Sequence, residues 1–454
     1  MEIFPDNRTR GACRHIARAA KEAGGRAYCV GGCVRDALLG VPPKDVDVEI
    51  YGLPAGEIEK MLAGKFRVEM VGKSFGVWIL KGLPIDVSMP RTERKTGAGH
   101  RAFEVEGDPF LSPMEACSRR DFTINAILYD ILSGEIIDPY RGCMDIEAGI
   151  LRHTSPRFSE DPLRVLRAMQ FSARFNMEVA PETVALCSEI GIENLPPERV
   201  FEEWKKLILK GREISRGLFF LRDCGWTRHF PELAAMDGCP QDPRWHPEGD
   251  VYTHTAFSMD SFASERTGDD REDLIVGLAV LCHDMGKPSC TFEDDRGIHS
   301  YGHDTAGVAF ARSFMERMTR EKSLVDAVLP LVERHMAILD LWRSKAGDSA
   351  IRRLAQKVGR IDRLVRVDSA DRGGRPPLDP GDSPQGAWIS ARAEELAIRD
   401  SAPKPLLMGR DLVELGLSPS PKFGEILDAA YEAQLDGAFS DRDGALDYAR
   451  KNLL

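Results

Sequence analysis

The chain has 454 residues with a formal net charge of −11, and 43% of its residues are hydrophobic and 29% are charged. This length and composition allow several packed domains and exclude a largely disordered chain. The acidic balance argues against a protein that coats nucleic acid indiscriminately, because phosphate binding normally needs clustered Lys and Arg.

The N-terminal residues and the cysteines indicate a soluble protein of a reducing compartment. Met1–Asp6 contain no basic segment followed by an apolar one, and no stretch approaches the ~18 apolar residues of a membrane helix. The ten cysteines contain no CxxC pair, which favours reduced thiols. We therefore expect a cytoplasmic protein that does not contact a membrane.

The first 140 residues predict a small mixed α/β domain. A helix is expected over residues 10–23, a strand over Ala27–Val30, and a glycine turn, Gly31-Gly32, that opens a second helix. The further elements predicted here are a strand at Asp45–Ile50, a helix near Ala55–Leu62, strands at Val77–Leu80 and Ile85–Met89, a mobile loop at 91–112 and a helix containing Arg120–Asp130.

The rest of the chain predicts helices almost throughout. Helical periodicity runs from Pro162 to about Cys224 and, after the proline-rich segment 239–243, continues to about residue 371. A Gly- and Pro-rich break at 373–382 precedes a last helical segment at Phe423–Gln434. We divide the chain into a head (1–140), a neck (141–238), a third domain (239–375) and a tail (376–454).

Two acidic residues stand two positions apart on a predicted strand. Because strand side chains alternate, Asp45 and Asp47 share one face, where they could hold a hard divalent cation. Asp86, on a later strand, is the natural third carboxylate, with a solvated strand-end residue as the alternative. The Gly31-Gly32 turn offers amide groups to a triphosphate, and Arg35 lies one turn into the following helix.

Four ordered segments resemble class II tRNA nucleotidyltransferases and bacterial poly(A) polymerases. They are Gly31–Gly40, Lys44–Asp47, Arg119–Ala126 and Glu160–Arg164. The resemblance is strong over residues 25–225. It implies an α+β multidomain protein with a polymerase-β-like nucleotidyltransferase head on an all-helical neck, and substrates that are CTP, ATP and the acceptor end of tRNA.

The resemblance also implies roles for individual residues. Asp45 and Asp47 would hold two Mg²⁺ ions for in-line phosphoryl transfer, and Asp86 would complete the site or accept the hydroxyl proton. The nucleotide-binding residues that it implies are Gly31, Gly32, Arg35, Lys44, Arg120, Asp121, Asn125, Glu160, Asp161, Arg164 and Arg167. Surface ion pairs are the alternative for Arg35 and Lys44, and helix capping is the alternative for Asp121.

The choice of nucleotide can be interpreted from one helix face. Cytosine and adenine each present an amino donor beside a ring acceptor, so a carboxylate and an arginine three residues apart can bind both. Asp161 and Arg164 have that spacing and match the family's template motif; an i,i+3 salt bridge is the alternative. Gln170 stands where family members commonly carry Arg, so the sequence leaves open whether that position contacts nucleotide or tRNA.

Histidines and aspartates form a second candidate site, in the third domain. His283-Asp284 follows an apolar helix, and His254, His303, His335 and Asp371 lie on other helical segments. The set resembles the HD phosphohydrolase superfamily, which implies a helical HD domain that binds one or two divalent transition metals. Asp368 is the alternative to Asp371 as the last ligand. Family members with such a domain suggest phosphatase or cyclic phosphodiesterase activity, or a tRNA-binding scaffold.

These observations favour an enzyme that adds CCA to tRNA. Enzymes that add only CC or only A, and poly(A) polymerases, share the same expected fold and stay as alternatives. From other classes we keep an HD phosphohydrolase with an inactive head and a noncatalytic RNA-binding module. The oligomeric state, monomer or homodimer, is left open by the sequence.

Overall fold

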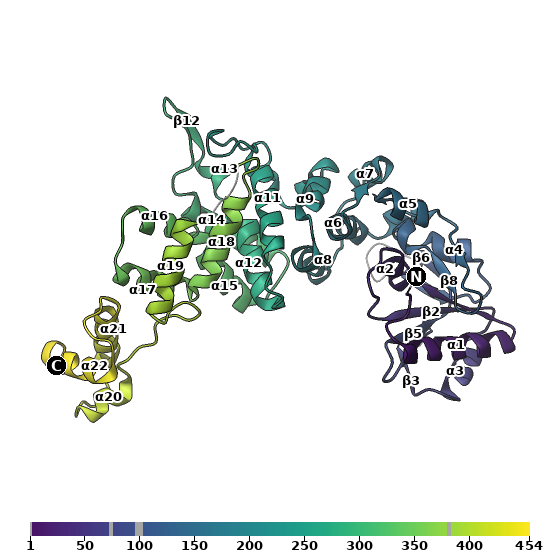
Figure 1. Ribbon diagram of the computed structural model, residues 1–454, viewed down its shortest axis with the longest axis horizontal. Helices are drawn as coiled ribbons and strands as arrows, with labels where there is room; N and C mark the ends of the chain where they lie inside the picture. Colours follow the sequence, from purple (N-terminus) through teal and green to yellow (C-terminus); the bar gives the residue numbers. More distant parts are fainter. Residues whose placement is uncertain (1, 72–75, 96–102, 379–382) are drawn as a thin grey trace. The chain divides into compact units, whose positions relative to one another are not determined.

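The computed structural model describes residues 2–71, 76–95, 103–378 and 383–454, with the backbone alone for 92–95 and 103–106. The chain divides into two compact units (Figure 1). Unit 1 comprises Met1–Leu207 and Arg216–His229, and unit 2 comprises Ile208–Ser215 and Phe230–Leu454. The finer division into head, neck, third domain and tail stays a prediction.

A seven-stranded sheet organises the first part of unit 1. Its strands, in spatial order, are β3 (Val68–Val71), β4 (Val77–Leu80), β5 (Ile85–Ser88), β2 (Val46–Tyr51), β1 (Arg26–Val30), β8 (Leu128–Asp130) and β9 (Ile136–Ile137). β2 and β5 pair in parallel, and the other neighbours pair antiparallel. This confirms the mixed α/β head, although β3, β8 and β9 were not predicted.

Two amphipathic helices, α1 (Asn7–Glu22) and α3 (Ala55–Ala63), cover one face of this sheet. Asp6 caps α1 by accepting a hydrogen bond from the backbone N–H of Thr9. The apolar stripe of α1, which includes Ile16, packs in one core with Val48 and its alternate neighbours on β2. Since strand side chains alternate, Asp47 lies on the opposite face of β2, away from the helices.

Two predictions in the head were wrong. Within the predicted loop, β6 (Arg91–Lys95) and β7 (Phe103–Gly107) pair antiparallel, and residues 96–102 lie outside the described residues. The helix predicted over Arg120–Asp130 is replaced by a short 3₁₀ turn, η1 (Thr123–Asn125), and by strand β8. The backbone of residues 128–130 pairs with β1, so the sheet takes hydrogen bonds that a helix would have kept within itself.

Helices dominate the remainder of unit 1, as predicted. They are α2 (Gly32–Leu38) and α4 (Pro113–Ser118) in the head, followed by α5 (Gly142–Ala148), α6 (Leu163–Phe175), α7 (Pro181–Ser188), α8 (Pro197–Lys210) and α9 (Ile214–Asp223). A two-stranded parallel ladder, β10 (Ile150–Leu151) with β11 (Glu178–Val179), interrupts them. Helix α8 continues beyond Leu207 into unit 2.

In the described part of unit 2 the secondary structure is helical except for the hairpin of β12 (Phe292–Asp294) with β13 (Gly297–His299). Its helices up to residue 395 are α10 (Pro231–Met236), α11 (Val251–Ser264), α12 (Asp270–Cys282), α13 (Lys287–Cys290), α14 (His303–Glu316), α15 (Lys322–Glu333), α16 (Ala337–Arg343), α17 (Asp348–Val358), α18 (Ile361–Gly373) and α19 (Pro384–Glu395). Residues Leu274–Cys282 of α12 are all buried, which places this helix at the centre of the unit.

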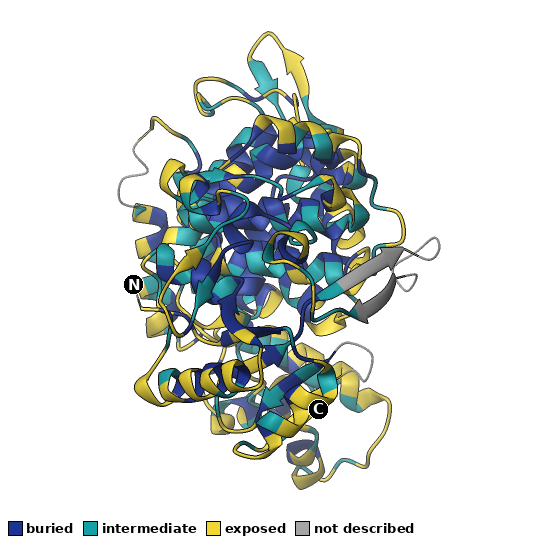
Figure 2. Cartoon of the chain, turned by 90° about the vertical axis from the view of Figure 1, so that its right-hand side faces the viewer, coloured by how far each residue is buried: buried dark blue, intermediate teal, exposed yellow. Residues whose placement is uncertain are grey.

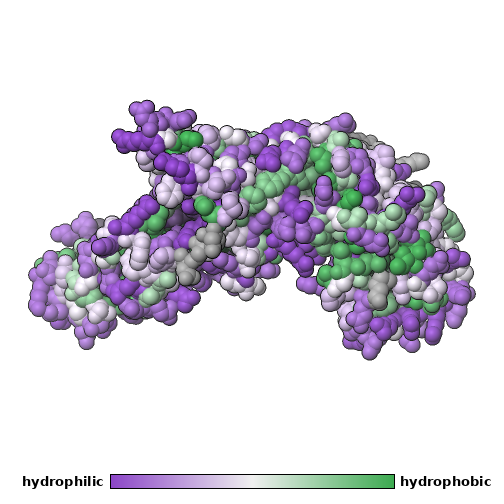
Figure 3. Space-filling model, turned by 45° about the horizontal axis from the view of Figure 1, so that its top comes forward, coloured by the Kyte–Doolittle hydropathy of each residue, from purple (hydrophilic) through white to green (hydrophobic). Residues whose placement is uncertain are grey.

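The C-terminal helices α20 (Gly409–Glu414), α21 (Lys422–Leu435) and α22 (Arg442–Asn452) have a core of their own. α21 matches the helix predicted at Phe423–Gln434. Buried residues gather in the interior, and exposed residues lie on the outer turns of helices and in loops (Figure 2). The visible surface is mostly hydrophilic, with hydrophobic residues in patches (Figure 3). Among the described residues, no helix is both long enough and apolar enough to cross a membrane.

Candidate functional site

Three carboxylates meet on the face of the sheet that α1 and α3 leave free. In the parallel ladder between β2 and β5, Asp47 stands directly opposite Asp86. Asp45 precedes Asp47 by two residues, just before β2 begins at Val46. The backbone N–H of Val46 donates to the carbonyl of Pro84 over 2.9 Å and fixes the register at this end.

Negative charge accumulates among these carboxylates. Loss of hydration raises the pKa of Asp47 to about 6; Arg120 opposes the shift, whereas the carboxylates of Asp45 and Asp86 add to it. The pKa of Asp86 is raised as well, first by loss of hydration and then by Asp45. A divalent cation would neutralise this mutual repulsion, so the chemistry of the three groups fits a magnesium site.

The glycine turn lies directly beside this site. Gly31 has a φ of +70°, which favours glycine. A Cβ atom at Gly31 would lie 3.0 Å from Nη1 of Arg120 and 3.8 Å from Oδ2 of Asp47. The missing side chain therefore leaves space next to the carboxylates, at the start of α2. Lys44, the other predicted triphosphate contact in this part, is exposed.

A buried glutamate that the sequence analysis missed orients the arginines near Asp47. The carboxylate of Glu49 accepts a 2.6 Å hydrogen bond from the hydroxyl of Tyr51 and lies 3.4 Å from Nη2 of Arg119 and 3.7 Å from Nη2 of Arg120. Period-two alternation along β2 places Glu49 on the same face as Asp47. This alternation could have identified Glu49 from the sequence as a neighbour of Asp47.

A chain of buried polar contacts joins α2, η1 and α6. Arg35 donates from Nη1 to Oδ1 of Asn125 over 2.6 Å, and Nδ2 of Asn125 donates to Oδ1 of Asp121 over 2.8 Å. Asp121 accepts a second hydrogen bond, of 2.7 Å, from Nε of Arg167. The guanidinium of Arg35 also lies 4.6 Å from the ring centre of Phe175.

In this series of hydrogen bonds, four residues predicted to contact the nucleotide bind one another within the protein instead. Arg35, Asp121 and Asn125 are buried. Burial alone would raise the pKa of Asp121, but the charge of Arg167 and hydrogen bonds from Arg167 and Asn125 hold this pKa below its usual value. The prediction that one helical turn presents Arg120, Asp121 and Asn125 was wrong, because η1 is a 3₁₀ turn of three residues. Direct nucleotide contacts from Arg35, Asp121, Asn125 and Arg167 stay predictions.

The predicted base-selecting residues do not pair with each other. Asp161 accepts from the backbone N–H of Leu163 over 3.0 Å and forms an ion pair of 3.1 Å with Arg199. Arg164 donates to the carbonyls of Arg157 and Arg119 over 2.8 and 2.6 Å. In the described parts of the chain the alternative, a salt bridge from Asp161 to Arg164, is therefore absent. Both side chains are only half-buried at the start of α6.

Two other positions of this segment differ from one another in exposure. Glu160 is half-buried at the end of the 3₁₀ turn before α6. Gln170 is 1% exposed, and its Oε1 atom has no hydrogen-bond partner among the described residues. The amide of Gln170 therefore lies inside the neck, where a nucleotide cannot reach it without rearrangement.

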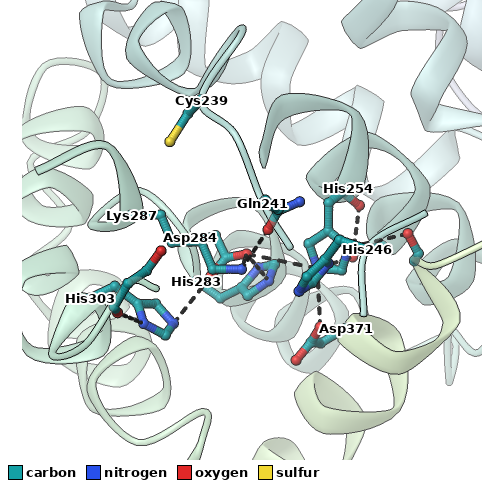
Figure 4. A network of polar contacts seen from close by, with 12 residues as sticks. Cys239, Gln241, His246, His254, His283, Asp284, Lys287, His303 and Asp371 are labelled. Carbon is teal, nitrogen blue, oxygen red and sulfur yellow. Dashed lines mark hydrogen bonds and ion pairs between the residues drawn. The ribbon is translucent and has the colours of Figure 1, made fainter. Parts of the chain in front are cut away.

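The histidine and aspartate side chains predicted to form a metal site come together in unit 2 (Figure 4). Asp284 is at the centre. Its carboxylate oxygens lie 3.2, 3.4, 3.8 and 4.0 Å from the Nε2 atoms of His283, His303, His254 and His335, respectively. Nε2 of His254 also lies 3.0 Å from Oδ1 of Asp371, although the two residues are 117 positions apart in the sequence.

Backbone carbonyls fix how the histidine rings point. Nδ1 of His283, His303 and His335 donates to the carbonyl three residues earlier over 2.7, 2.7 and 2.8 Å. In the neutral ring this leaves a lone pair on Nε2. The Nε2 atoms of His303 and His335 lie 3.1 Å apart, and two lone pairs at that distance repel unless a cation lies beside them. The donor set therefore fits a divalent metal.

Four residues beside this cluster were missed by the sequence analysis. Oε1 of Glu248 accepts from Nδ1 of His254 over 2.7 Å and from Nδ1 of His246 over 2.9 Å. Nζ of Lys287 lies 2.7 Å from Oδ2 of Asp284, and Arg375 donates to Asp371 over 2.7 Å. Lys287 follows Asp284 by three residues, so their spacing was a usable signal; Glu248 and Arg375 carried none.

The choice between two aspartates on α18 is visible in the geometry. Asp371 contacts His254, whereas Asp368 accepts from Oγ of Ser383 over 3.3 Å. Burial, and then the nearby charge of Asp371, raise the pKa of Asp368 to about 6. Asp368 is therefore a neighbour of the cluster rather than a member of it.

Two sequence families match parts of the chain. Residues 27–152 match the family described as "Poly A polymerase head domain", and residues 176–237 match "Probable RNA and SrmB- binding site of polymerase A". The "Multifunctional CCA protein" of Nitrosococcus oceani is 36% identical over 86% of this chain and 93% of that protein. That of Xanthomonas campestris pv. campestris is 35% identical over 92% of this chain and 100% of that protein.

Solved structures resemble the fold along almost its whole length. The Bacillus stearothermophilus CCA-adding enzyme in complex with CTP matches with a TM-score of 0.67 and 23% identity, over 97% of this chain and 98% of that one. The Thermotoga maritima CCA-adding enzyme complexed with tRNA matches with a TM-score of 0.62 and 20% identity, over 99% of this chain and 96% of that one.

The raised pKa of Asp47 predicts a pH-dependent stability. The pKa of Asp47 is about 6 in the folded protein and about 4 in the unfolded chain. Between about pH 4 and pH 6 the folded state therefore binds more protons, so the free energy of unfolding falls as pH rises through this range. The side chain of Asp47 is exposed, so solvent screening reduces this effect. Asp47→Asn should therefore raise the melting temperature at pH 8 by roughly 1–3 °C and leave it unchanged at pH 4.

Thermal unfolding followed by circular dichroism, with Glu59→Gln as the control for an exposed carboxylate, measures this difference. Millimolar MgCl₂ at pH 8 should remove it by stabilising the unmodified protein. An equal melting temperature of the Asp47→Asn variant and the unmodified protein at pH 8 without magnesium would contradict the assignment of repelling carboxylates.

Proposed function

This chain belongs to the family of the multifunctional CCA proteins, and on that premise we propose that it adds C and A nucleotides to the 3′ end of tRNA, with CTP and ATP as substrates. The observation that carries the proposal is the alignment of Asp47 with Asp86 across the β2–β5 ladder, next to the Gly31 turn. It places acidic groups for a cation beside space for a triphosphate.

Asp45 and Asp47 would hold two magnesium ions, with Asp86 completing the site. Bound there, the ions supply Lewis acidity for in-line displacement at the α-phosphate of the nucleotide. Asp86, whose pKa is raised, would also accept the proton of the tRNA 3′-hydroxyl. The family to which the chain belongs supports the use of a divalent metal; the pairing of two ions is our inference.

The amides at the start of α2 and the side chain of Lys44 would bind the triphosphate. Gly31 and Gly32 leave these amides accessible, and a helix N-terminus favours phosphate. Arg120, held between Glu49 and Asp47, would contact the phosphates on the other side. In this proposal Arg35, Asn125, Asp121 and Arg167 act mainly by holding α2 and α6 in place around the nucleotide.

Asp161 and Arg164 would select the base. Both carboxylate oxygens of Asp161 already have a partner, Leu163 N–H at Oδ1 and Arg199 at Oδ2, so a base would bind through their remaining lone pairs. Arg164 keeps guanidinium N–H groups beyond the two that bond to carbonyls. Guanine and uracil would turn a carbonyl oxygen toward the carboxylate, which is unfavourable where water is excluded. Glu160, half-buried beside them, would assist from the same motif.

The cluster around Asp284 would form a metal-dependent phosphohydrolase centre, that is, an HD domain. His254, His283, Asp284 and Asp371 would hold one divalent transition metal, and His303 and His335, with Asp284 as the bridge, would allow a second. A bound metal supplies activated water and polarises a phosphoryl oxygen. Lys287 and Arg375 would orient an anionic substrate such as a phosphate monoester or a 2′,3′-cyclic phosphate.

The direct test of the main activity uses tRNA transcripts that end before CCA, after C and after CC. Purified protein with Mg²⁺ and each labelled nucleotide should incorporate two C residues and one A residue. Incorporation of C only, of A only, or of long A tails would support the alternatives within the family. No incorporation would leave the RNA-binding and phosphohydrolase alternatives.

Arg164→Ala tests the selection of the base. Loss of the guanidinium should lower the discrimination of CTP and ATP against UTP and GTP by roughly 5- to 150-fold, the equivalent of ~1–3 kcal/mol for a bidentate contact. Arg157→Ala on the same surface is the control. Ratios of kcat/KM for the four nucleotides give the result, and unchanged ratios in the Arg164→Ala variant would exclude the template role.

Asp284→Ala separates the two centres. Hydrolysis of 2′,3′-cyclic nucleotides and of p-nitrophenyl phosphate, assayed with Ni²⁺, Mn²⁺ or Mg²⁺, should fall at least 100-fold while nucleotide addition to tRNA is retained. Asp326→Ala, an exposed carboxylate of α15, is the control. If the unmodified protein hydrolyses neither compound with any of these metals, the phosphohydrolase proposal is wrong.

A further inference from the structure

A basic groove lies between α1 and the far edge of the sheet in unit 1. It has a volume of about 620 Å³. One wall is the exposed side of α1, and the other is formed by the segment after α3 and the turn between β4 and β5. Six cations line it: Arg8, Arg14, Arg18, Lys65, Arg67 and Lys81. No carboxylate is among its lining residues.

The cations of this groove are poorly neutralised. Within the described ranges, Lys81 has an ion-pair partner, Glu69, and the other five cations have none within 4.0 Å. Ion pairs are common elsewhere in the same chain, which carries a net charge of −11. Like charges gathered without carboxylates destabilise the fold unless an anion binds them, so the groove has the electrostatics of a polyanion site.

The groove is distinct from the candidate active site. Helix α1 packs through Ile16 and its neighbours against the face of β2 that carries Val48. Asp47, one residue earlier, projects from the other face. A ligand in the groove therefore lies behind the sheet with respect to the carboxylates, and it cannot be the triphosphate that reacts at Asp45 and Asp47.

The shape and the lining favour a nucleic-acid backbone. A concave groove cannot meet a flat membrane surface with both of its walls. Its cations come from separate segments along both sides, as a chain of phosphates requires. His15 and Phe66, which line the groove with their ring centres 5.9 Å apart, add an aromatic surface on which a base can stack.

We propose that this groove binds the phosphate backbone of RNA at a second site, away from the nucleotide-addition centre. It would hold either a distant part of the tRNA that is being extended or a second RNA strand, because both present the same phosphates. The inference uses tRNA as its probe and does not depend on the chemistry proposed for Asp47 or on the cluster around Asp284.

The test is the salt dependence of RNA binding. The Kd of the full-length chain for a tRNA that already ends in CCA is measured by fluorescence anisotropy between 50 and 300 mM KCl. Loss of one phosphate contact lowers the slope of log Kd against log salt by about 0.9. The double variant Arg14→Glu/Arg18→Glu should lower the slope by about 2 and weaken binding roughly tenfold or more at 100 mM KCl.

Lys21→Glu is the control, since Lys21 is exposed on the same helix outside the groove. Circular dichroism should show that the variants unfold at the temperature of the unmodified protein. A slope that changes no more in the double variant than in Lys21→Glu would overturn the proposal. Because no nucleotide is added to this tRNA, the result is independent of whether the chain performs CCA addition.

A 12-nucleotide single strand and an acceptor-stem minihelix separate the two RNA sources. If the groove holds the distant part of the tRNA, Arg14→Glu/Arg18→Glu weakens binding of tRNA but leaves the minihelix unaffected. If it holds a second strand, the variant weakens binding of the single strand as well. Equal competition for tRNA binding by polyglutamate and by RNA at equal charge would contradict a site built for RNA.

Discussion

The parallel pairing of β2 with β5 is the constraint on which the candidate active site depends. It sets Asp47 directly opposite Asp86, while the neighbouring Val48 and Val87 face the hydrophobic core on the other side. A shift of one residue in this register would place valine at the site and carboxylate in the core. The apolar pattern of the strands therefore holds the charged groups together against their mutual repulsion.

Unit 2 arranges its polar cluster in a different way. Here the polar residues lie at the ends of helices and not on a sheet. His283 and Asp284 follow α12, His303 is the first residue of α14, and His335 follows α15. The Nδ1 protons of His283 and His335 are accepted by carbonyls in the last turns of α12 and α15, and that of His303 by Ser300 in the segment before α14. The backbone thus sets the orientation of the rings before any metal is considered, and the apolar helix α12 keeps the centre buried.

Unit 1 uses its arginines in two different ways. Around Asp121, guanidinium groups join secondary-structure elements through buried hydrogen bonds, which makes Arg35 and Arg167 part of the framework. In the groove beside α1, exposed arginines such as Arg14 and Arg18 have no carboxylate partner among the described residues. The same residue type thus serves to stabilise the fold in one place and offers a binding surface in another.

The sequence by itself determined the elements whose signal is local. Apolar periodicity gave α1, β2 and the long helices, and the spacing of Asp45 and Asp47 placed both on one face of a strand. Adjacent His283-Asp284 marked the second cluster. Tertiary structure alone decided which side chains became partners. Asn125 and Asp121 join Arg35 to Arg167, and Glu248 holds His246 and His254. Likewise, only the fold sets α1 opposite Lys65 and Arg67 across a groove. The physical reason is that periodicity depends on neighbours a few residues away, whereas these contacts join side chains that only packing brings together, as with His254 and Asp371, 117 residues apart.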